Sequence, residues 1–253
     1  MDIYRCKLEV MDYLFFATVE RGKVYETGPF IHNYTLCYAL QLATSPYFHR
    51  VQKPQYKQDL TPLNKLGIYL TPARPFKISY RLTQWNTMQE AYGFPKKERN
   101  IGYPDWGFAR VIKPGSTFEF YALIAKKTSV SQFPAFASLL TGKTGYIRLG
   151  KFMAKSRISI TQAPNVEEKQ GAFWAHIVSD RSRINTEQGY FSLLLNWRDI
   201  LANPITCDIY PTTLPTRLIA NPRYESGKYF LAEFADEDKV IFPAEMCFIA
   251  REI

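Results

Sequence analysis

The sequence has no long hydrophobic run. No stretch reaches the roughly 18 consecutive apolar residues that a membrane-spanning helix needs. The first residues, from Met1 to Val10, alternate apolar and charged side chains, whereas a secretory signal peptide needs an unbroken apolar stretch. The sequence therefore predicts a cytoplasmic protein with no membrane partner.

Patterns that would mark a metal or cofactor site are also lacking. None of the three histidines lies in an HxxxH or HExxH arrangement, and no two of the four cysteines lie within thirty positions of each other. A relaxed match to a phosphate-binding loop at 137–144 has alanine in place of the first glycine, and a helix-like segment precedes it where a strand is needed. We therefore expect no metal and no cofactor. The residues concerned are His32, His49, His176, Cys6, Cys37, Cys207 and Cys247.

One catalytic route stays open. A metal-independent ribonuclease can work with a single histidine as acid or base, helped by a lysine and a tyrosine. His32 and His176 are the candidates for that role. A histidine outside any such constellation is more often structural, so we expect a protein that is not an enzyme and keep the ribonuclease as the alternative.

Acidic residues are absent between Glu119 and Glu167, and a second basic stretch at 74–113 precedes this segment. The chain holds 32 lysines and arginines against 23 aspartates and glutamates, which favours a polyanionic partner. Two other interpretations are a solvated surface and a contact with an acidic protein. The cations that we assign to phosphate binding are Arg74, Lys77, Arg81, Lys96, Lys97, Arg99, Arg110, Lys143, Arg148, Lys151, Lys155 and Arg157.

The order of periodic segments predicts an α+β fold. Strand, helix, strand, long insertion, strand, helix and strand follow one another over residues 1–160, which is the βαββαβ order of a ferredoxin-like or RRM-like core. Ser131, Pro134 and Gly142 are expected to cap, begin and close the second helix. We expect one compact body over 1–253, with a thumb-like insertion at about 72–116 and a β-rich part at 161–253 that includes a hairpin. The predicted segments are strands at 4–10, 66–70, 76–82, 118–124 and 146–160, helices at 30–43 and 131–142, an irregular stretch at 92–116, and hairpin strands at 229–234 and 239–242. In the strand at 76–82, Phe76, Ile78, Tyr80 and Leu82 are expected to share one face.

The strand at 146–160 changes its pattern at Gly150. Apolar residues occupy odd positions before Gly150 and even positions after it, and a slip of one residue exchanges the two faces of a strand. We therefore expect a bulge or sharp bend at Gly150, with Lys151, Lys155 and Arg157 on one face beyond it. A bent strand with a cationic face suits a groove for a phosphate backbone. The alternative is a twisted edge strand whose lysines prevent aggregation.

Several short strings resemble the Csc-one family. They are YRCKL at 4–8, LFFAT at 14–18, YET at 25–27, IHNY at 31–34, ARP at 73–75, WN at 85–86, NI at 100–101, STFEF at 116–120 and IRLGK at 147–151. These strings span roughly residues 1–160 in order, and the likeness is vaguer beyond them. The Csc-one family belongs to the Cas-five group of type I-D CRISPR Cascade complexes.

The resemblance implies a non-catalytic subunit of a ribonucleoprotein complex in antiviral defence. It implies one copy that holds the repeat-derived 5′ handle of the guide RNA, and contacts with the backbone-forming and large subunits near the place where target DNA enters. It also implies an RRM-like core with an extended thumb, and guide cleavage by a separate subunit. The duplex next to the protospacer-adjacent motif is a further candidate partner.

The residue-level interpretation agrees with this role, because unpaired bases stack on aromatic rings while cations hold phosphates. The candidate rings are Tyr80, Trp85 and Tyr146, with Tyr103 as a further one in the insertion. The alternatives are a metal-independent endoribonuclease that processes CRISPR transcripts and a purely structural bridge between protein partners.

Overall fold

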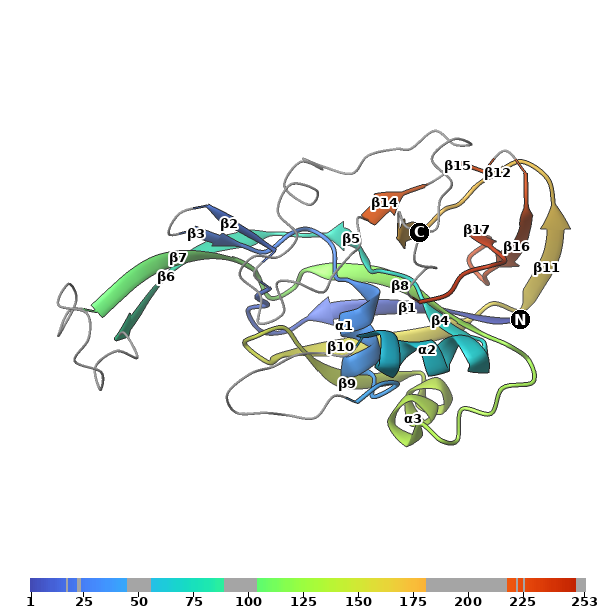
Figure 1. Cartoon of the computed structure of the whole chain (residues 1–253), viewed down its shortest axis with the longest axis horizontal. Helices are drawn as coiled ribbons and strands as arrows, with labels where there is room; N and C mark the ends of the chain where they lie inside the picture. The colour runs from blue at the N-terminus through green and yellow to red at the C-terminus, as the bar shows by residue number, and fades with distance from the viewer. Residues whose placement is uncertain are drawn as a thin grey trace.

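The largest sheet, which we call the main sheet, has the strand order β4-β8-β1-β10-β9, with neighbouring strands antiparallel (Figure 1). A short strand, β5, also pairs with β8. The computed structural model describes residues 1–16, 18–21, 24–44, 56–88, 104–180, 218–221, 223–224 and 226–248. The strands of the main sheet are β1 (Asp2–Val10), β4 (Ile68–Leu70), β5 (Arg74–Lys77), β8 (Thr117–Ile124), β9 (Thr144–Leu149) and β10 (Ala154–Gln162).

The main sheet has an apolar face and a polar face because side chains alternate along each strand. On β1, Cys6, Leu8 and Val10 are buried, while Lys7 and Glu9 on the other side retain solvent contact. The alternation predicted for this strand is thus confirmed. Helices supply buried side chains to the same core as the apolar face. These helices are α1 (Asn33–Ala39), α2 (Tyr56–Leu66) and α3 (Pro134–Gly142).

The first predicted helix, 30–43, is too long. In the structure α1 begins after His32, whose Nδ1 accepts a hydrogen bond from the backbone N–H of Tyr34 (3.3 Å). The last helical residue is Ala39 and Leu40 is the C-cap, and Gln41 then has a positive φ of 58° that the helix cannot continue through. The sequence interpretation also missed α2, which carries a proline at position 62 in its interior.

The second predicted helix exists as α3, with Pro134 in its first turn as expected. Its cap differs from the prediction, because Phe133 and not Ser131 stands at the N-cap. At the other end, the left-handed residue is Lys143 (φ 58°) and not Gly142, which remains helical. This one-residue shift places Lys143 at the junction between α3 and β9.

A four-stranded sheet of order β2-β3-β7-β6 protrudes from the body, and its β6–β7 pair reaches farthest (Figure 1). Within the stretch predicted to be irregular, 92–116, residues 104–112 form strand β7, while residues 89–103 lie outside the described part. The strand β3 pairs with β7 in parallel, so residues well before the insertion also support it. The bounds are β2 (Val19–Arg21), β3 (Val24–Glu26), β6 (Tyr80–Met88) and β7 (Pro104–Ile112).

The strand predicted at 76–82 is divided between two sheets. β5 ends at Lys77 on the main sheet and β6 begins at Tyr80 on the protruding sheet. The predicted shared face is interrupted, because Phe76 lies on β5, Ile78 lies between the strands, and Tyr80 and Leu82 lie on β6 of the other sheet. Phe76 and Leu82 are 87% and 58% exposed. The chain changes partner at Ser79, whose N–H donates to the Ser116 hydroxyl (3.2 Å).

The described C-terminal residues are strands and turns, and the hairpin predicted at 229–234 and 239–242 is confirmed. It forms the C-terminal sheet, of order β11-β16-β17. This sheet covers one end of the polar face of the main sheet, where the ring of Tyr121 lies 5.0 Å from that of Phe242. The bounds are β11 (Asn165–Gln170), β12 (Phe173–Trp174), β13 (Val178–Asp180), β14 (Leu218–Ala220), β15 (Arg223–Tyr224), β16 (Lys228–Glu233) and β17 (Lys239–Pro243), and β12–β15 and β13–β14 are two small pairs.

Candidate nucleic-acid interface

The segment predicted as one bent strand, 146–160, is a hairpin in which β9 and β10 lie antiparallel. The chain reverses at Gly150 (φ 69°) and Met153 (φ 52°), so the predicted bend is a tight turn. A Cβ atom on Gly150 would lie 2.5 Å from the carbonyl oxygen of Phe15, which explains why glycine is needed there. The N–H of Lys151 donates to that same oxygen (2.9 Å), so Lys151 lies in the turn and does not share a strand face with Lys155.

The hairpin gathers cations and a ring at the edge of the main sheet. The Lys155 ammonium lies 4.4 Å from the centroid of the Tyr146 ring, and that ring is 57% exposed. Arg148 is the residue paired with Lys155 across the two strands, and Lys143 is exposed at the start of β9. We call Lys143, Tyr146, Arg148 and Lys155 the edge patch. A cavity of about 460 Å³ lies beside it, lined by Tyr38, Ala39, Gln41, Tyr146, Ile147, Arg148, Met153 and Lys155.

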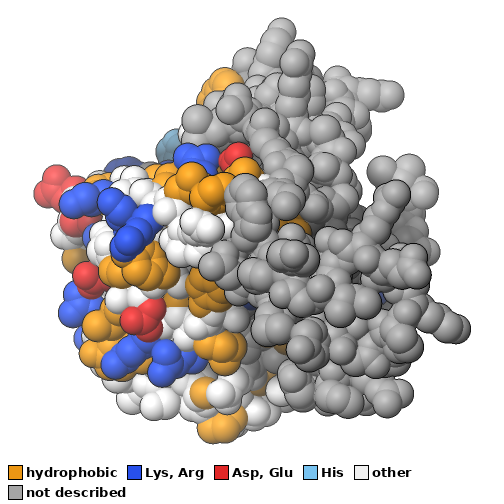
Figure 2. Space-filling view, turned by 90° about the vertical axis from the view of Figure 1, so that its left-hand side faces the viewer, with side chains coloured by type: hydrophobic (Ala, Val, Ile, Leu, Met, Phe, Trp, Pro, Cys, Tyr) orange, Lys and Arg blue, Asp and Glu red, His pale blue; other side chains and the backbone are white. Residues whose placement is uncertain are grey.

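The edge patch has an excess of positive charge. Among the described residues, Arg148 and Lys155 adjoin one carboxylate, that of Asp12, while Lys143 is exposed at the other end of β9. Asp12 lies 3.8 Å from Arg148 Nη1, and both side chains are more than half exposed, so this ion pair neutralises little. Figure 2 shows lysine and arginine side chains interspersed with hydrophobic ones on the described part of the face that it presents. Such a surface offers cations for phosphates and a ring for a base.

The backbone of β9 adds donors to the edge patch. The carbonyl of Lys155 accepts from the N–H of Met11, and the N–H of Ala163 donates to the carbonyl of Ile3, so odd-numbered residues of the β10 segment face β1. The N–H of Ile160 donates to the carbonyl of Lys143, so even-numbered residues face β9. Because peptide groups of an antiparallel strand alternate in direction, those of Thr144, Tyr146 and Arg148 point out of the open edge of the sheet. The outward N–H groups can donate to a phosphate oxygen, while the outward carbonyl groups of the same residues can accept from a ligand hydroxyl or amine.

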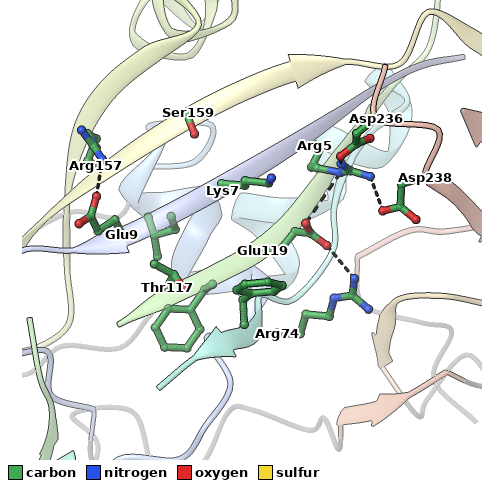
Figure 3. A pocket seen from close by; sticks show the side chains of 13 residues that line it. Arg5, Lys7, Glu9, Arg74, Thr117, Glu119, Arg157, Ser159, Asp236 and Asp238 are labelled. Carbon is green, nitrogen blue, oxygen red and sulfur yellow. Dashed lines mark hydrogen bonds and ion pairs between the residues drawn. The ribbon is translucent and has the colours of Figure 1, made fainter. Parts of the chain in front are cut away.

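Three other predicted cations lie on or beside the polar face of the main sheet. Arg157 Nη2 is 2.5 Å from Glu9 Oε2, and Arg74 Nη2 is 2.7 Å from Glu119 Oε1. Lys77 pairs with Thr117 at the end of β5. The charges of Arg74 and Arg157 are thus balanced within the protein. They line the open-face cavity, of about 570 Å³, whose residues are drawn in Figure 3: Arg5, Lys7, Leu8, Glu9, Arg74, Phe76, Thr117, Phe118, Glu119, Arg157, Ser159, Asp236 and Asp238.

The sequence interpretation missed Arg5, which joins the main sheet to the C-terminal sheet. Its side chain is 5% exposed, and its Nη1 and Nη2 donate to Asp236 and Asp238, each at 2.6 Å. Its guanidinium also lies 4.0 Å from the centroid of the Phe234 ring, and its Nε is 3.8 Å from Glu119. Position 5 falls on the polar face of β1, but nothing in the sequence relates it to an acidic turn 231 positions away.

The remaining predicted residues belong to the protruding sheet or lie outside the described part. The Arg110 guanidinium stacks 4.0 Å from the centroid of Tyr80 and lies 3.3 Å from Glu26. Arg81 Nη1 donates to the hydroxyl of Tyr13 (2.7 Å). Lys96, Lys97, Arg99, Tyr103 and the side chain of Trp85 lie outside the described residues. Among the described residues, the structure therefore places Tyr146, Arg148 and Lys155 together on the β9–β10 hairpin, with Lys143 at the start of β9 and Arg157 paired with Tyr146. Other predicted cations in the described part lie elsewhere: Arg74, Lys77, Arg81 and Arg110.

The two histidines proposed for catalysis lie in different places. Burial lowers the pKa of His32 to about 3, so its imidazole is neutral and serves as the cap of α1. His176 Nδ1 lies 3.2 Å from the carbonyl oxygen of Lys239, beside the C-terminal sheet. Among the described residues, no group of three or more His, Cys, Asp or Glu side chains could hold a metal ion. No helix in the described part of the chain is both long and apolar enough to cross a membrane.

Three solved structures are similar to the chain at low identity. A chain of the type III-B Cmr-beta complex bound to cognate target RNA has 10% identity and a TM-score of 0.42, and the match covers 64% of this chain and 60% of that one. A CRISPR protein from Archaeoglobus fulgidus has 12% identity and a TM-score of 0.40, with 96% and 100% covered. A chain of a type IV-B CRISPR complex has 9% identity and a TM-score of 0.34, with 64% and 91% covered. This chain thus spans about 60% of the length of the Cmr-beta chain. No curated protein matches it.

The family itself is shown by a family model that covers nearly the whole chain. The model described as "Type I-D CRISPR-associated protein Cas5/Csc1" matches residues 1–251. The match extends well beyond the strings at 1–160 and includes the C-terminal sheet. It confirms the resemblance to the Csc-one family, and the chain therefore belongs to the type I-D CRISPR-associated Cas5/Csc1 family.

Proposed function

We propose that this chain is a non-catalytic RNA-binding subunit of a CRISPR surveillance complex, and that its edge patch holds the phosphate backbone of the 5′ handle of the guide RNA. The observation that carries the proposal is the excess of positive charge around the exposed ring of Tyr146, next to outward-facing peptide groups. Membership of the Cas5/Csc1 family supports a role in a CRISPR complex.

The arrangement of the main sheet supports a ferredoxin-like core. The order β4-β8-β1-β10, with helices between β1 and β4 and between β8 and β10, is the order that a βαββαβ unit produces, and β9 is an additional edge strand. In this core the edge patch lies at one border of the sheet. The usual stacking face of an RRM corresponds here to the polar face, where the arginines of the open-face cavity are paired with carboxylates.

The protein partners that we propose are the backbone-forming and large subunits of the complex, in the cytoplasm. The protruding sheet extends away from the core, so much of its surface does not pack against the core and could contact a partner subunit (Figure 1). In complexes of this kind base pairing reads the target sequence, while protein holds backbone and shape. A position near the protospacer-adjacent motif of the target DNA duplex is part of the same proposal.

The edge patch can be tested by the double substitution Arg148→Ala with Lys155→Ala. Each lost phosphate contact lowers the salt dependence of binding by about one unit, so we expect the slope of log affinity against log salt to fall by about two. Affinity for a handle RNA at moderate salt should fall at least about tenfold. Fluorescence anisotropy with labelled handle RNA over a salt series measures both quantities.

A matched control removes the same charge elsewhere. Lys126 and Lys127 are exposed at the turn after β8 and lie outside the edge patch. Their double substitution to alanine should leave the slope within about half a unit of the wild-type value, since these lysines make no phosphate contact in this proposal. Equal losses for the two double variants would mean that only net charge matters, and the assignment of the edge patch would be wrong.

A further inference from the structure

The open-face cavity lies where the C-terminal sheet leaves the polar face of the main sheet uncovered. Strand register sets four of its residues in a row across the sheet: Arg74 is opposite Glu119, Glu119 is opposite Lys7, and Lys7 is opposite Ser159. These side chains project into the same space in Figure 3. The cavity of about 570 Å³ is large enough for a nucleotide.

The positive and negative charges that line the cavity are equal in number only because the turn between β16 and β17 contributes two carboxylates. The four cations of the cavity are Arg5, Lys7, Arg74 and Arg157, and its four carboxylates are Glu9, Glu119, Asp236 and Asp238. Asp236 and Asp238 come from the turn between β16 and β17, and their side chains are 55% and 52% exposed. Without these two carboxylates the cavity would carry an excess of two positive charges.

Two donor groups in the cavity, the Lys7 ammonium and Arg5 Nε, could each donate a hydrogen bond to a ligand. Among the described residues, the ammonium of Lys7 has no ion-pair or hydrogen-bond partner, although the cations around it are paired. Arg5 Nε is buried and has no hydrogen-bond partner, whereas the Nη atoms of Arg5 donate to the turn. Arg5 Nε lies 3.8 Å from a Glu119 oxygen, too far for a hydrogen bond. A buried donor without a hydrogen bond is costly, so a ligand oxygen that reached it would be held strongly.

The rim of the cavity offers an aromatic face. Phe76 is 87% exposed, although a phenylalanine on a strand would normally be buried. Thr117 adds a hydroxyl group on β8, between the strand of the ring and that of Lys7, and Ser159 adds another on the far side of Lys7. A ring beside cations and hydroxyls fits a ligand that combines a planar base with a phosphate.

We propose that the open-face cavity is a second binding site, for the phosphate and base of a nucleotide, and that Asp236 and Asp238 occupy its arginine as competitors from within the chain. Carboxylate and phosphate oxygens pair with a guanidinium in the same way, so the acidic turn stands where ligand oxygens would stand. The base packs on Phe76, and the phosphate lies between Lys7 and Arg5. This cavity adjoins the edge patch, because its Arg157 is the residue paired with Tyr146 across β9 and β10, and the expectation of a tethered nucleotide rests on the proposed function.

The competitor makes the site selective. A free nucleotide must displace two carboxylates from Arg5, whereas a nucleotide in a strand already bound to the protein arrives at a high effective concentration. The cavity is therefore expected to remain closed to free anions and to accept a tethered nucleotide. Asp236 and Asp238 compete with a phosphate through their negative charge. Removing that charge should therefore raise the affinity for a phosphate even if the hydrogen bonds from Arg5 are kept.

The test is the double substitution Asp236→Asn with Asp238→Asn in the full chain. An asparagine carbonyl still accepts a hydrogen bond from Arg5, but the two negative charges are gone. We expect calorimetry with AMP to show affinity at least about tenfold higher than that of the wild type, because two repulsive charges near the phosphate are removed. Adding Lys7→Ala should abolish the gain, and adding Phe76→Ala should reduce AMP binding to the level of inorganic phosphate.

The matched control is Glu237→Gln, which removes one charge from the same turn at an exposed residue that does not contact Arg5. It should leave AMP binding unchanged within about twofold, since its charge is outside the cavity. If the double variant does not fold, Asp238→Asn compared with Glu237→Gln decides the same question with one charge each. AMP binding no tighter than in the wild type, or a gain that survives Lys7→Ala, would overturn the proposal.

Discussion

Arginine side chains in this protein have two kinds of environment, and the difference is a property of single residues. Arg157 and Arg74 lie within 2.7 Å of carboxylates, which offset their charge even though both arginine side chains are partly exposed. Arg148 lies 3.8 Å from a single half-exposed carboxylate and keeps most of its field. The partner of Arg157 is 148 positions away in the chain. Counting cations along the sequence therefore found the basic region but could not tell which of its cations remain available.

At the same scale, His32 should make the protein sensitive to mild acid. Burial holds the pKa of His32 near 3, whereas the unfolded chain has the ordinary value of about 6.5. As pH falls below about 6.5 the unfolded state binds a proton that the folded state does not, so the free energy of unfolding decreases. Urea unfolding at pH 7.5 and at pH 5 measures this loss.

The matched variants for this prediction are His32→Asn and His176→Asn. Asparagine keeps a side-chain oxygen for the N-cap of α1 but does not titrate, so the loss between the two pH values should be smaller than in the wild type. The variant at position 176 should follow the wild type. Equal losses in all three proteins would show that other groups carry the acid sensitivity.

At the scale of elements, the β9–β10 turn depends on Gly150. Alanine there would adopt a φ of 69° and place its Cβ 2.5 Å from a backbone oxygen, so we expect Gly150→Ala to destabilise the protein by about 2 kcal/mol or more. Thermal or urea unfolding measures the change, and the edge patch should bind RNA more weakly because the turn positions it.

Two other glycines separate the causes of that effect. Gly115 has a φ of 79°, and no atom lies within 4 Å of a Cβ added there. Gly115→Ala therefore reports backbone strain alone, which we expect to lower the free energy of unfolding by about 1 kcal/mol. Gly142 lies in α3 with open space around it, and Gly142→Ala should be neutral or stabilising. A loss at Gly150 no greater than that at Gly115 would rule out the close approach to Phe15.

Periodicity in the sequence predicted elements better than it predicted their connections. The alternation of β1 and the apolar character of β8 are local properties, and both strands were predicted close to their observed bounds. The change of phase at Gly150 was detected, but a bulge and a tight hairpin turn produce the same exchange of faces. The break at Ser79 left no trace in the pattern, because strands on two different sheets can continue one alternation.

At the scale of the whole molecule, the N-terminal strand and the C-terminal sheet are joined by one arginine. Arg5 on β1 reaches Asp236 and Asp238, and its guanidinium also packs on Phe234. Burial raises the pKa of Tyr121, so its phenol stays protonated and donates to Glu119 (2.7 Å), which is also bonded to Arg74. The polar face is thus one connected network, and among the described residues Arg5 is the side chain whose ion pairs span the two sheets.

Replacing Arg5 with methionine tests whether this residue holds the two sheets together. The carboxylates of the turn would return to water while Glu119 keeps Arg74 and Tyr121, so we expect a loss of about 1–3 kcal/mol in unfolding free energy, which is less than for a fully buried ion pair. Amide exchange should accelerate in β16 and β17 and stay unchanged in β1 and β8, because the contact that is lost lies between the sheets.

The control is Arg157→Met, which breaks an exposed pair within one sheet and should cost under about 1 kcal/mol. Exchange that accelerates equally in both variants, or in β1 as much as in β16, would mean that apolar packing around Phe242 fixes the C-terminal sheet and that Arg5 serves only to bind the acidic turn.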